Sequence, residues 1–356
     1  MKRVVVGLSG GVDSAVAAYL LKERGYEVIG LFMRNWKETD DGKCTAAEDY
    51  SDVRKVSDAI GIPYYSVDFS EQYMERVFKL FVSEYKKGRT PNPDVLCNSE
   101  IKFETFRKYA LKLNADYIAT GHYACLENVN GLNYLMRAAD ENKDQTYFLN
   151  QVKGEQFNNV LFPIGGLIKN QVRQIAKENN IPNYAKKDST GICFIGERNF
   201  REFLAGYIPM KKGRIMTLDN KVVGEHNGVY YYTIGQRRGL GIGGTKEGLG
   251  DRWFVIGKDV ANNILYVSEG EDSALYSSEL ILDNFNFITS PVEENSFKCA
   301  ARIRHRQPLQ DAVLYNGDGV MRLVFDTPQR APAEGQYAVI YNGRHCVGGG
   351  VIDAVK

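Results

Sequence analysis

Residues 9–14, Ser-Gly-Gly-Val-Asp-Ser, constrain the fold of this chain more than any other segment. They follow an apolar run at 4–6 and precede a helix-forming stretch at 15–21 with an apolar stripe. A strand that turns through two glycines into a helix presents backbone N–H groups and a positive helix end to an anion. The Gly-Lys-Ser/Thr ending of a Walker A loop is absent. We therefore predict a phosphate-binding turn, the alternative being a tight turn without a ligand.

The first part of the chain alternates strand-like and helix-like segments. Strands are predicted near 27–33, 64–68 and 117–122, and helices near 46–60, 70–85, 99–113 and 169–178. This alternation favours an α/β fold, a mostly parallel sheet with helices on both faces. Ligands of such sheets bind at the carboxyl ends of the strands. Residues 9–14, Met33, Gly121 and His122 would all lie there.

Beyond about residue 210 the pattern changes to short alternating runs separated by glycine- and asparagine-rich turns. Segments 213–218, 222–224, 229–233, 253–258 and 264–267 are the strand candidates of a first β region. The region from about 278 onward repeats this character. We expect an α/β catalytic domain at 1–205, a small central β domain at 206–275 and a C-terminal β-barrel at 276–356.

Composition indicates an ordinary globular chain of 356 residues with 44% hydrophobic residues and a formal net charge of +1. No apolar run approaches the length of a membrane span or a signal peptide, so we expect a cytoplasmic protein without a membrane partner. Short basic clusters recur along the chain and make an extended polyanion a plausible partner. Arg302, Arg304 and Arg306 are expected to alternate along one strand face, suited to phosphates or to solvent.

Two of the six cysteines stand apart from the others. Cys97 follows a proline-stiffened loop and is expected just before a helix that begins near Asn98 or Ser99, where the helix end lowers a thiol pKa. Cys193 lies in a polar, glycine-containing loop near Lys186 and Lys187, which would also favour the thiolate. No CxxC pair appears, so a zinc ribbon is not predicted. Each cysteine alone fits an inert thiol, whereas the pair suggests sulfur transfer.

The glycine-rich turn by itself resembles the pyrophosphate loop of the N-type ATP pyrophosphatases. Further motifs resemble the bacterial tRNA-specific 2-thiouridylases, in the same order through the whole chain. These motifs are TPNPDVLCN at 90–98, GHY at 121–123, KDQTYFL at 143–149, STGICFIG at 189–196 and YTIGQR at 232–237. The fold implied is an adenine nucleotide α-hydrolase-like domain followed by the two β domains.

The resemblance implies a role for each matching residue. Cys97 would be the nucleophile, Cys193 would carry the persulfide, and Asp94 would manage protons at the base. The ATP site would comprise Gly7, Leu8, Ser9, Gly10, Gly11, Val12, Asp13, Ser14, Met33 and Gly121, with Asp13 also a candidate Mg²⁺ ligand. Asn92, Pro93 and Asp94 would meet the target base, and the tRNA would touch His122, Lys143, Asp144, Gln145, Arg304, His305 and Gln336.

The reaction implied is ATP-dependent 2-thiolation of the wobble uridine in tRNAs for lysine, glutamate and glutamine. Adenylation of the C2 oxygen would precede delivery of sulfur, by direct persulfide attack or as hydrosulfide, and a Cys97–Cys193 disulfide would remain. The Cys193 loop is expected to be mobile, so that the two thiols can meet. The sulfur would come from a cysteine desulfurase or a relay protein. A small-molecule ATP pyrophosphatase and a non-catalytic RNA-binding or redox-sensing protein stay open as alternatives.

Overall fold

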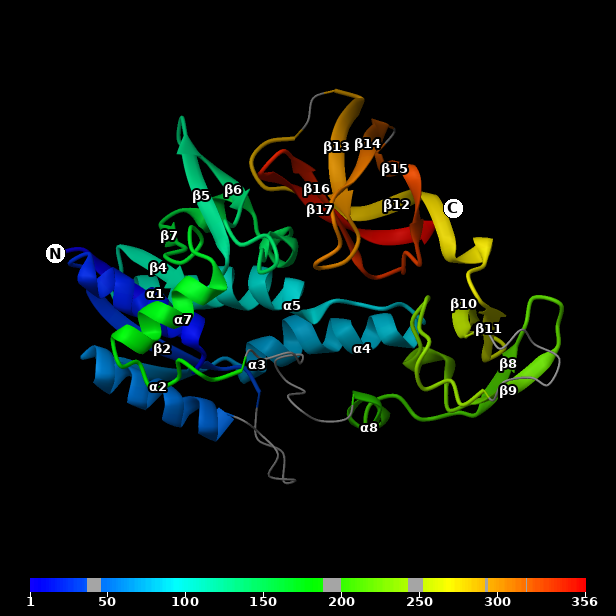
Figure 1. Ribbon diagram of the computed structural model, residues 1–356, viewed down its shortest axis with the longest axis horizontal. Helices are drawn as coiled ribbons and strands as arrows, with labels where there is room; N and C mark the ends of the chain where they lie inside the picture. Colours follow the sequence, from blue (N-terminus) through cyan, green and yellow to red (C-terminus); the bar gives the residue numbers. More distant parts are fainter. Residues whose placement is uncertain (37–45, 188–199, 243–251, 292–293, 318) are drawn as a thin grey trace.

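The computed structural model describes residues 1–36, 46–187, 200–242, 252–291, 294–317 and 319–356. Figure 1 shows an α/β region on one side and two β regions on the other. The predicted fold class, α/β followed by two β units of which the last is a barrel, is confirmed. Among the helices described, none is both long enough and apolar enough to cross a membrane.

A parallel five-stranded sheet forms the centre of the α/β region. Val4, Val5 and Val6 of its middle strand are fully buried, as expected for a strand covered on both faces. Its strands, in spatial order, are β3 (Tyr64–Asp68), β2 (Glu27–Arg34), β1 (Arg3–Leu8), β4 (Tyr117–Thr120) and β7 (Val160–Leu161).

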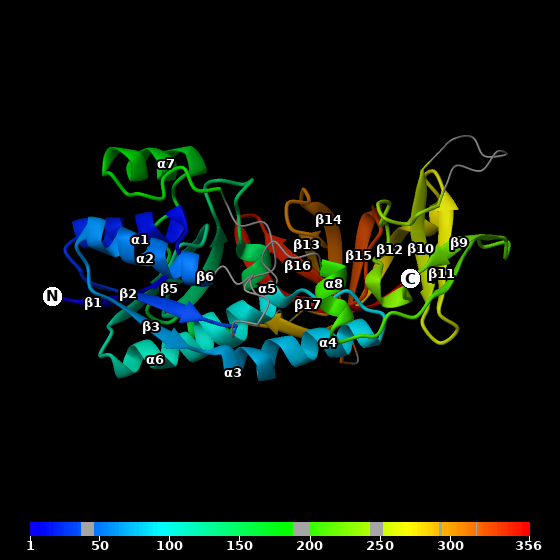
Figure 2. The same cartoon turned by 90° about the horizontal axis from the view of Figure 1, so that it is seen from below.

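Helices cover both faces of this sheet, as Figure 2 shows. One face carries α1 (Val12–Glu23), α2 (Ala46–Ile60) and α7 (Lys169–Glu178). Below the other face run two longer helical stretches. The first joins α3 (Ser70–Tyr73), the π-helix η1 (Met74–Phe78) and α4 (Lys79–Lys86), and the second joins α5 (Pro93–Leu96), the π-helix η2 (Cys97–Phe106) and α6 (Arg107–Lys112).

The central β region is a four-stranded sheet. Its order is β10 (Trp253–Asp259), β11 (Ile264–Glu269), β8 (Gly213–Met216) and β9 (Val222–His226). The strand predicted at 229–233 is wrong, because this segment begins with the 3₁₀ turn η5 (Val229–Tyr231), which packs Val229 and Tyr231 into the core. The short helix α8 (Phe200–Ala205) precedes this sheet.

The C-terminal strands close into a barrel. In order they are β12 (Tyr276–Phe287), β15 (Val320–Arg330), β14 (Gln310–Gly317), β13 (Ser296–Arg302), β16 (Tyr337–Asn342) and β17 (His345–Val355), and β12 pairs back onto β17. The hairpin β5 (Ala124–Val129) and β6 (Leu132–Arg137) leaves the α/β region and extends this sheet through a single β6–β17 register pair, Met136 with His345. The barrel is therefore joined to the first region by a shared sheet.

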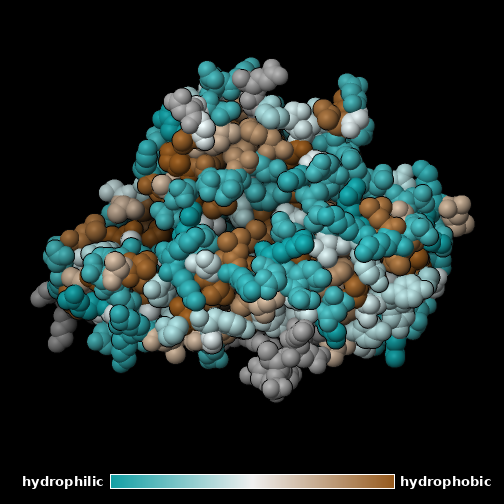
Figure 3. Space-filling view, turned by 180° about the vertical axis from the view of Figure 1, so that it is seen from behind, coloured by the Kyte–Doolittle hydropathy of each residue, from teal (hydrophilic) through white to brown (hydrophobic). Residues whose placement is uncertain are grey.

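Three short 3₁₀ turns complete the described elements. They are η3 (Thr146–Leu149), η4 (Gly154–Phe157) and η6 (Ser273–Leu275). The first two follow the β5–β6 hairpin, and η4 contacts both β6 and η2. On the face shown in Figure 3, hydrophilic side chains are spread widely, with apolar residues between them.

Candidate active site

The glycine loop, residues 9–14, connects β1 to α1 at the carboxyl end of the parallel sheet. Hydroxyl groups hold its shape: the Ser14 Oγ donates to the Gly11 oxygen at 3.1 Å and accepts from the Ser9 N–H at 3.2 Å. Gly11 is the N-cap of α1 and has no side chain to cap the helix. The N–H groups of the first turn are therefore available to an anion.

Two glycines make this loop possible. Gly10 has φ +75°, and a Cβ there would lie 2.8 Å from the Asp49 main-chain oxygen of α2. Gly121, just after β4, packs against the start of α1, where a Cβ would lie 2.6 Å from the Ser14 nitrogen. Both positions thus require the absence of a side chain.

We predict that Gly121→Ala lowers the affinity for ATP by about tenfold to a hundredfold, because the new methyl group must displace the backbone of the glycine loop. Isothermal titration calorimetry with ATP measures the effect. Gly166→Ala is the matched control, since a Cβ there has no atom within 4 Å. Equal affinities of the two variants would contradict this account of the loop.

The other residues predicted to bind ATP gather around the loop. The Met33 methyl group lies beside Gly7, so that a Cβ on Gly7 would approach it to 3.2 Å. Leu8 and Val12 are buried in the core. These two can face a nucleotide only through their main chain.

Asp13, the predicted metal ligand, already has a cationic partner. The Lys169 Nζ, at the first residue of α7, lies 2.7 and 2.8 Å from the two carboxylate oxygens of Asp13. The Tyr123 hydroxyl donates to the same carboxylate at 2.9 Å. Among the residues described, no group of three or more His, Cys, Asp or Glu could hold a metal ion. A metal here would need the oxygens of a bound phosphate as additional ligands. Mg²⁺ is commonly bound in this way, by one or two carboxylates and substrate phosphates.

Cys97 lies inside a helix, and the prediction that it precedes the helix is wrong. The helix begins earlier, with Asn92 as N-cap and Pro93 at its first position, and the Asn92 Oδ1 accepts from the Asp94 N–H at 3.2 Å. Asn and Pro are favoured at these two positions. Cys97 then opens the π-helix η2, a helix form frequent at functional sites.

The surroundings of the Cys97 thiol disfavour its ionised, thiolate form. The residue is 1% exposed and packs in the same apolar cluster as Val95 and Ile101. Burial raises the pKa of Cys97 to about 11; the charge of Lys102 acts against this rise and that of Asp94 adds to it. The predicted lowering of this pKa by a helix end is therefore not found in the free protein.

We predict that iodoacetamide modifies Cys97 very slowly in the free protein at pH 8, where a pKa of about 11 leaves about one thiol in a thousand ionised. The rate should rise with pH up to that pKa. Peptide mass spectrometry measures it, and the chain unfolded in guanidinium is the control. Equal rates in the folded and unfolded protein at pH 8 would contradict the burial of this thiol.

The loop before Cys97 is fixed by both β regions. The Gln336 Nε2 of the barrel donates to the Thr90 oxygen at 2.7 Å, and the Thr90 and Thr233 hydroxyls lie 3.3 Å apart. Lys258 of β10 donates to the main-chain oxygens of Gly88 and Tyr232. Residues 88–92 therefore lie where the α/β region, the central sheet and the barrel meet.

The predicted tRNA-contacting residues of the α/β region differ in exposure. His122 is buried and its Nδ1 lies 2.7 Å from the Thr120 Oγ1; burial lowers its pKa well below the usual range and keeps the ring neutral. Lys143 and Gln145 are half-buried, and the Gln145 side chain accepts from the Tyr123 N–H at 2.9 Å. The Asp144 carboxylate is fully buried, where it accepts from Thr146 and pairs with Arg302.

The predicted strip of arginines along one strand is wrong. β13 ends at Arg302, whose side chain is 3% exposed, and Arg306 has φ +67° in the following turn. Arg302 meets neither phosphate nor solvent, the two environments expected for it, since it pairs with Asp144 and the Tyr341 hydroxyl. Arg304 is exposed and donates to the Ala331 oxygen at 2.6 Å.

His305 connects the barrel to the cysteine helix. The centre of its ring lies 4.5 Å from the centre of the Phe148 ring, and its Nε2 lies 3.2 Å from the Asp144 main-chain oxygen. The Phe148 oxygen accepts from the side chain of Asn98, next to Cys97, at 2.9 Å. Sequence reasoning missed Lys169, Asn98 and Phe148 as parts of the site, because no local pattern signals contacts over such sequence distances.

Cys193 and its loop at 188–199 lie outside the described residues, so the predicted mobility of that loop and its approach to Cys97 stay predictions. The chain before this loop is held against the nucleotide-binding end. Asn183 donates to the Gly10 oxygen at 3.0 Å, and the Lys186 ammonium group pairs with Asp49 and Asp52 of α2 at 2.9 and 2.8 Å.

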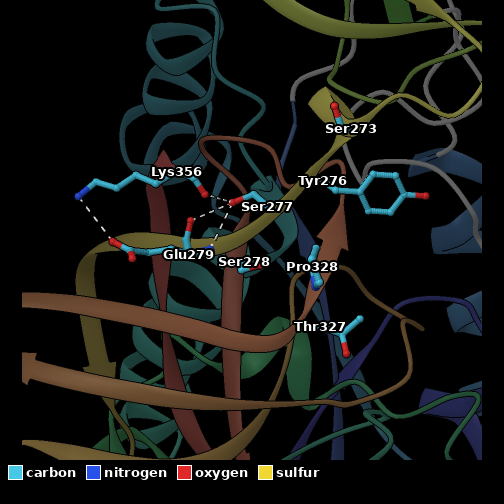
Figure 4. A pocket seen from close by; sticks show the side chains of 8 residues that line it. All are labelled: Ser273, Tyr276, Ser277, Ser278, Glu279, Thr327, Pro328 and Lys356. Atoms are coloured by element: carbon cyan, nitrogen blue, oxygen red, sulfur yellow. Dashed lines mark hydrogen bonds and ion pairs between the residues drawn. The ribbon is translucent and has the colours of Figure 1, made fainter.

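Two surface cavities stand out among the described residues. One of about 280 Å³ lies next to the glycine loop and is lined by Glu48, Asp52, Lys55, Pro182, Asn183 and Lys186. The other, of about 690 Å³, lies where β12 and β15 meet Lys356; Figure 4 shows Ser277 and Glu279 linked to that residue. Of the predicted site residues that the structure describes, none lines this second cavity.

Comparisons with known proteins cover nearly the whole chain. Family models described as a tRNA methyl transferase HUP domain, a tRNA methyl transferase PRC-barrel domain and an aminomethyltransferase beta-barrel domain match residues 2–197, 201–269 and 277–352. Three relatives bear the name tRNA-specific 2-thiouridylase MnmA, the second of them as MnmA 1. The protein of Pediococcus pentosaceus is 56% identical, that of Geobacillus kaustophilus 55% and that of Streptococcus pyogenes 54%. Each alignment covers 99% of this chain and 95, 96 and 95% of the relative, respectively.

Proposed function

This chain belongs to the tRNA-specific 2-thiouridylase family, and from that premise we propose that it replaces the C2 oxygen of the wobble uridine in tRNA with sulfur, using ATP. The protein is a tRNA sulfurtransferase. The tRNAs for lysine, glutamate and glutamine are the proposed acceptors. The observation that carries the proposal is that the α/β region holds both a glycine loop at a helix start without a side-chain cap and a cysteine helix whose N-cap, Asn92, precedes Pro93 and Asp94.

Thiolation accounts for these residues better than methyl transfer, which the descriptions of two family models name. A carbonyl oxygen is a poor leaving group. Adenylation, which releases pyrophosphate, attaches AMP to that oxygen, so that it can leave as part of AMP. Methyl transfer to a base does not need that activation by ATP. The glycine loop and Cys97 therefore support an activated carbonyl and a sulfur nucleophile.

The nucleotide half of the proposed reaction takes place at the glycine loop. Main-chain N–H groups of residues 9–14 and the end of α1 would bind the phosphates, with Met33, Gly7 and Gly121 around the nucleoside. Mg²⁺ would neutralise phosphate charge when bound, held by phosphate oxygens and by Asp13. The uridine C2 oxygen would attack the α-phosphorus, and the bond to pyrophosphate would break.

The sulfur half involves two cysteines. Cys193 would carry a persulfide supplied by a cysteine desulfurase or a relay protein. In one route the terminal sulfur attacks C2, AMP leaves, and the Cys97 thiolate then cleaves the mixed disulfide at the Cys193 sulfur. In the other, Cys97 first displaces hydrosulfide, which attacks C2. Both routes give 2-thiouridine, AMP and a Cys97–Cys193 disulfide that a thiol reductant must reduce.

Cys97 must change its environment for either route. In the free protein its thiol is buried and its pKa is about 11. Binding of the flipped-out base against Asn92, Pro93 and Asp94 would open this helix start and expose the thiol, and the Asp94 carboxylate would accept the proton. An inert thiol in the absence of tRNA would also protect Cys97 from wasteful oxidation.

The tRNA would bind across the junction of the three regions. Lys143, Gln145, Arg304, His305 and Gln336 are the proposed contacts. Of these, Gln336 donates to the Thr90 oxygen, and His305 contacts the main chain of Asp144, which lies between Lys143 and Gln145. His122 and Asp144, both buried, would act by holding their neighbours in place. We assign 1–205 to catalysis, 206–275 to the central β domain and 276–356 to the barrel, and we place the enzyme in the cytoplasm.

The direct test is an incubation of the protein with ATP, cysteine, a cysteine desulfurase and an unmodified lysine tRNA transcript. Nucleoside mass spectrometry should find 2-thiouridine, and a transcript with cytidine at the wobble position should give none. Pyrophosphate should appear only with the first transcript. Pyrophosphate release without RNA would indicate a small-molecule ATP pyrophosphatase, and a methylated uridine would indicate methyl transfer.

A further inference from the structure

The Lys169 side chain lies in a place that ordinary helix preferences disfavour. It is the first residue of α7, where the positive helix end disfavours a cation, and the residue is only 9% exposed. A buried ammonium group in such a position needs a strong partner. Asp13, at the start of α1 in the glycine loop, is such a partner.

The geometry shows a matched pair of charges. The Lys169 Nζ contacts both carboxylate oxygens of Asp13, at 2.7 and 2.8 Å, and lies 5.8 Å from the centre of the Tyr123 ring. The side chains of Lys169 and Asp13 are 11% and 30% exposed. Solvent therefore screens this pair only weakly.

We propose that Lys169 is a positioning residue for the nucleotide step, which neutralises Asp13 so that the glycine loop can accept the phosphates of ATP. A bare carboxylate at the start of α1 would repel a polyanion and cancel part of the positive helix end. With Lys169 in place, the loop offers its N–H groups without a net negative neighbour. This inference rests on the proposed nucleotide site and on no later step of the reaction.

The test measures ATP binding by isothermal titration calorimetry. The buffer contains EDTA and no metal, tRNA or sulfur donor. We expect Lys169→Gln to weaken binding by about tenfold, because Asp13 then keeps its negative charge without a cationic partner. In the double variant Asp13→Asn, Lys169→Gln the affinity should return to within about threefold of the original protein. Lys177→Gln, on the exposed side of the same helix, is the matched control and should bind as the original does.

Each other outcome overturns the proposal. A double variant as weak as Lys169→Gln alone would mean that the lysine acts on the phosphates directly and not through Asp13. If the unsubstituted protein did not bind ATP without metal, the Asp13–Lys169 pair would not make the glycine loop able to accept phosphates. If Lys169→Gln does not fold, adding Asp13→Asn should restore folding in circular dichroism, and failure to do so would reject the role of the pair. Failure of uridine thiolation would leave these binding results unaffected.

Discussion

Cys97→Ser is expected to abolish formation of 2-thiouridine while tRNA-dependent release of pyrophosphate continues. A hydroxyl group cannot attack the Cys193 sulfur at useful rates, so neither proposed sulfur route can be completed. Adenylation precedes both routes and takes place at the glycine loop, which the substitution does not touch. Nucleoside mass spectrometry and a pyrophosphate assay on the same reaction separate the two steps.

Cys299→Ser is the control for this experiment. Cys299 lies in β13 of the barrel, half-buried, with its Sγ 3.5 Å from the Ala312 oxygen. Its replacement should leave both products unchanged. Thiolation at the original rate by Cys97→Ser would remove this cysteine from the mechanism, whereas loss of pyrophosphate as well would assign it to the adenylation step.

Arg302→Met should lower the free energy of unfolding by about 3 kcal/mol or more, as measured by urea denaturation, because it leaves the Asp144 carboxylate charged and buried. Arg302 also donates to the Tyr341 hydroxyl at 3.0 Å and stacks on that ring, so these contacts are lost too. The nearest other cation, Arg137, lies 3.8 Å from the same carboxylate, too far for a hydrogen bond.

Arg322→Met provides a matched comparison in the same barrel. Its guanidinium group is 3.4 Å from Glu279, and the two side chains are 43% and 27% exposed. Such an exposed pair contributes at most about 1 kcal/mol. A double variant, Asp144→Asn with Arg302→Met, should recover part of the loss. Equal costs for Arg302→Met and Arg322→Met would contradict the special role of the buried pair.

Local sequence patterns predicted the elements whose stability is local. The strands and helices of the α/β region and the turn at 9–14 have a hydrophobic periodicity, a composition and flanking glycines or prolines that agree with their final structure. Tertiary contacts do not override these local signals. The start of the cysteine helix was predicted too late, although Asn92-Pro93 carries the N-cap and first-turn signal. Pro93 is compatible with the first helical position as well as with a loop, and only the helical position fits the structure.

Long-range contacts account for what the sequence could not predict. Nothing near Arg302 indicates that Asp144 will bury its charge, and nothing near Lys169 points to Asp13. The Cys97 pKa depends on apolar side chains from several elements, so a rule about helix ends predicted its direction wrongly. Likewise, periodicity does not reveal that the β5–β6 hairpin extends the barrel sheet.

The central claim is that Cys97 and Cys193 act on one adenylated uridine, and peptide mapping after a single turnover tests it most directly. The persulfide-loaded protein is mixed with ATP and tRNA, quenched in acid and digested without reductant. We predict a disulfide-linked peptide pair containing Cys97 and Cys193, equal in amount to the 2-thiouridine formed and absent when ATP or tRNA is omitted. A full yield of 2-thiouridine without that linked pair would contradict the account.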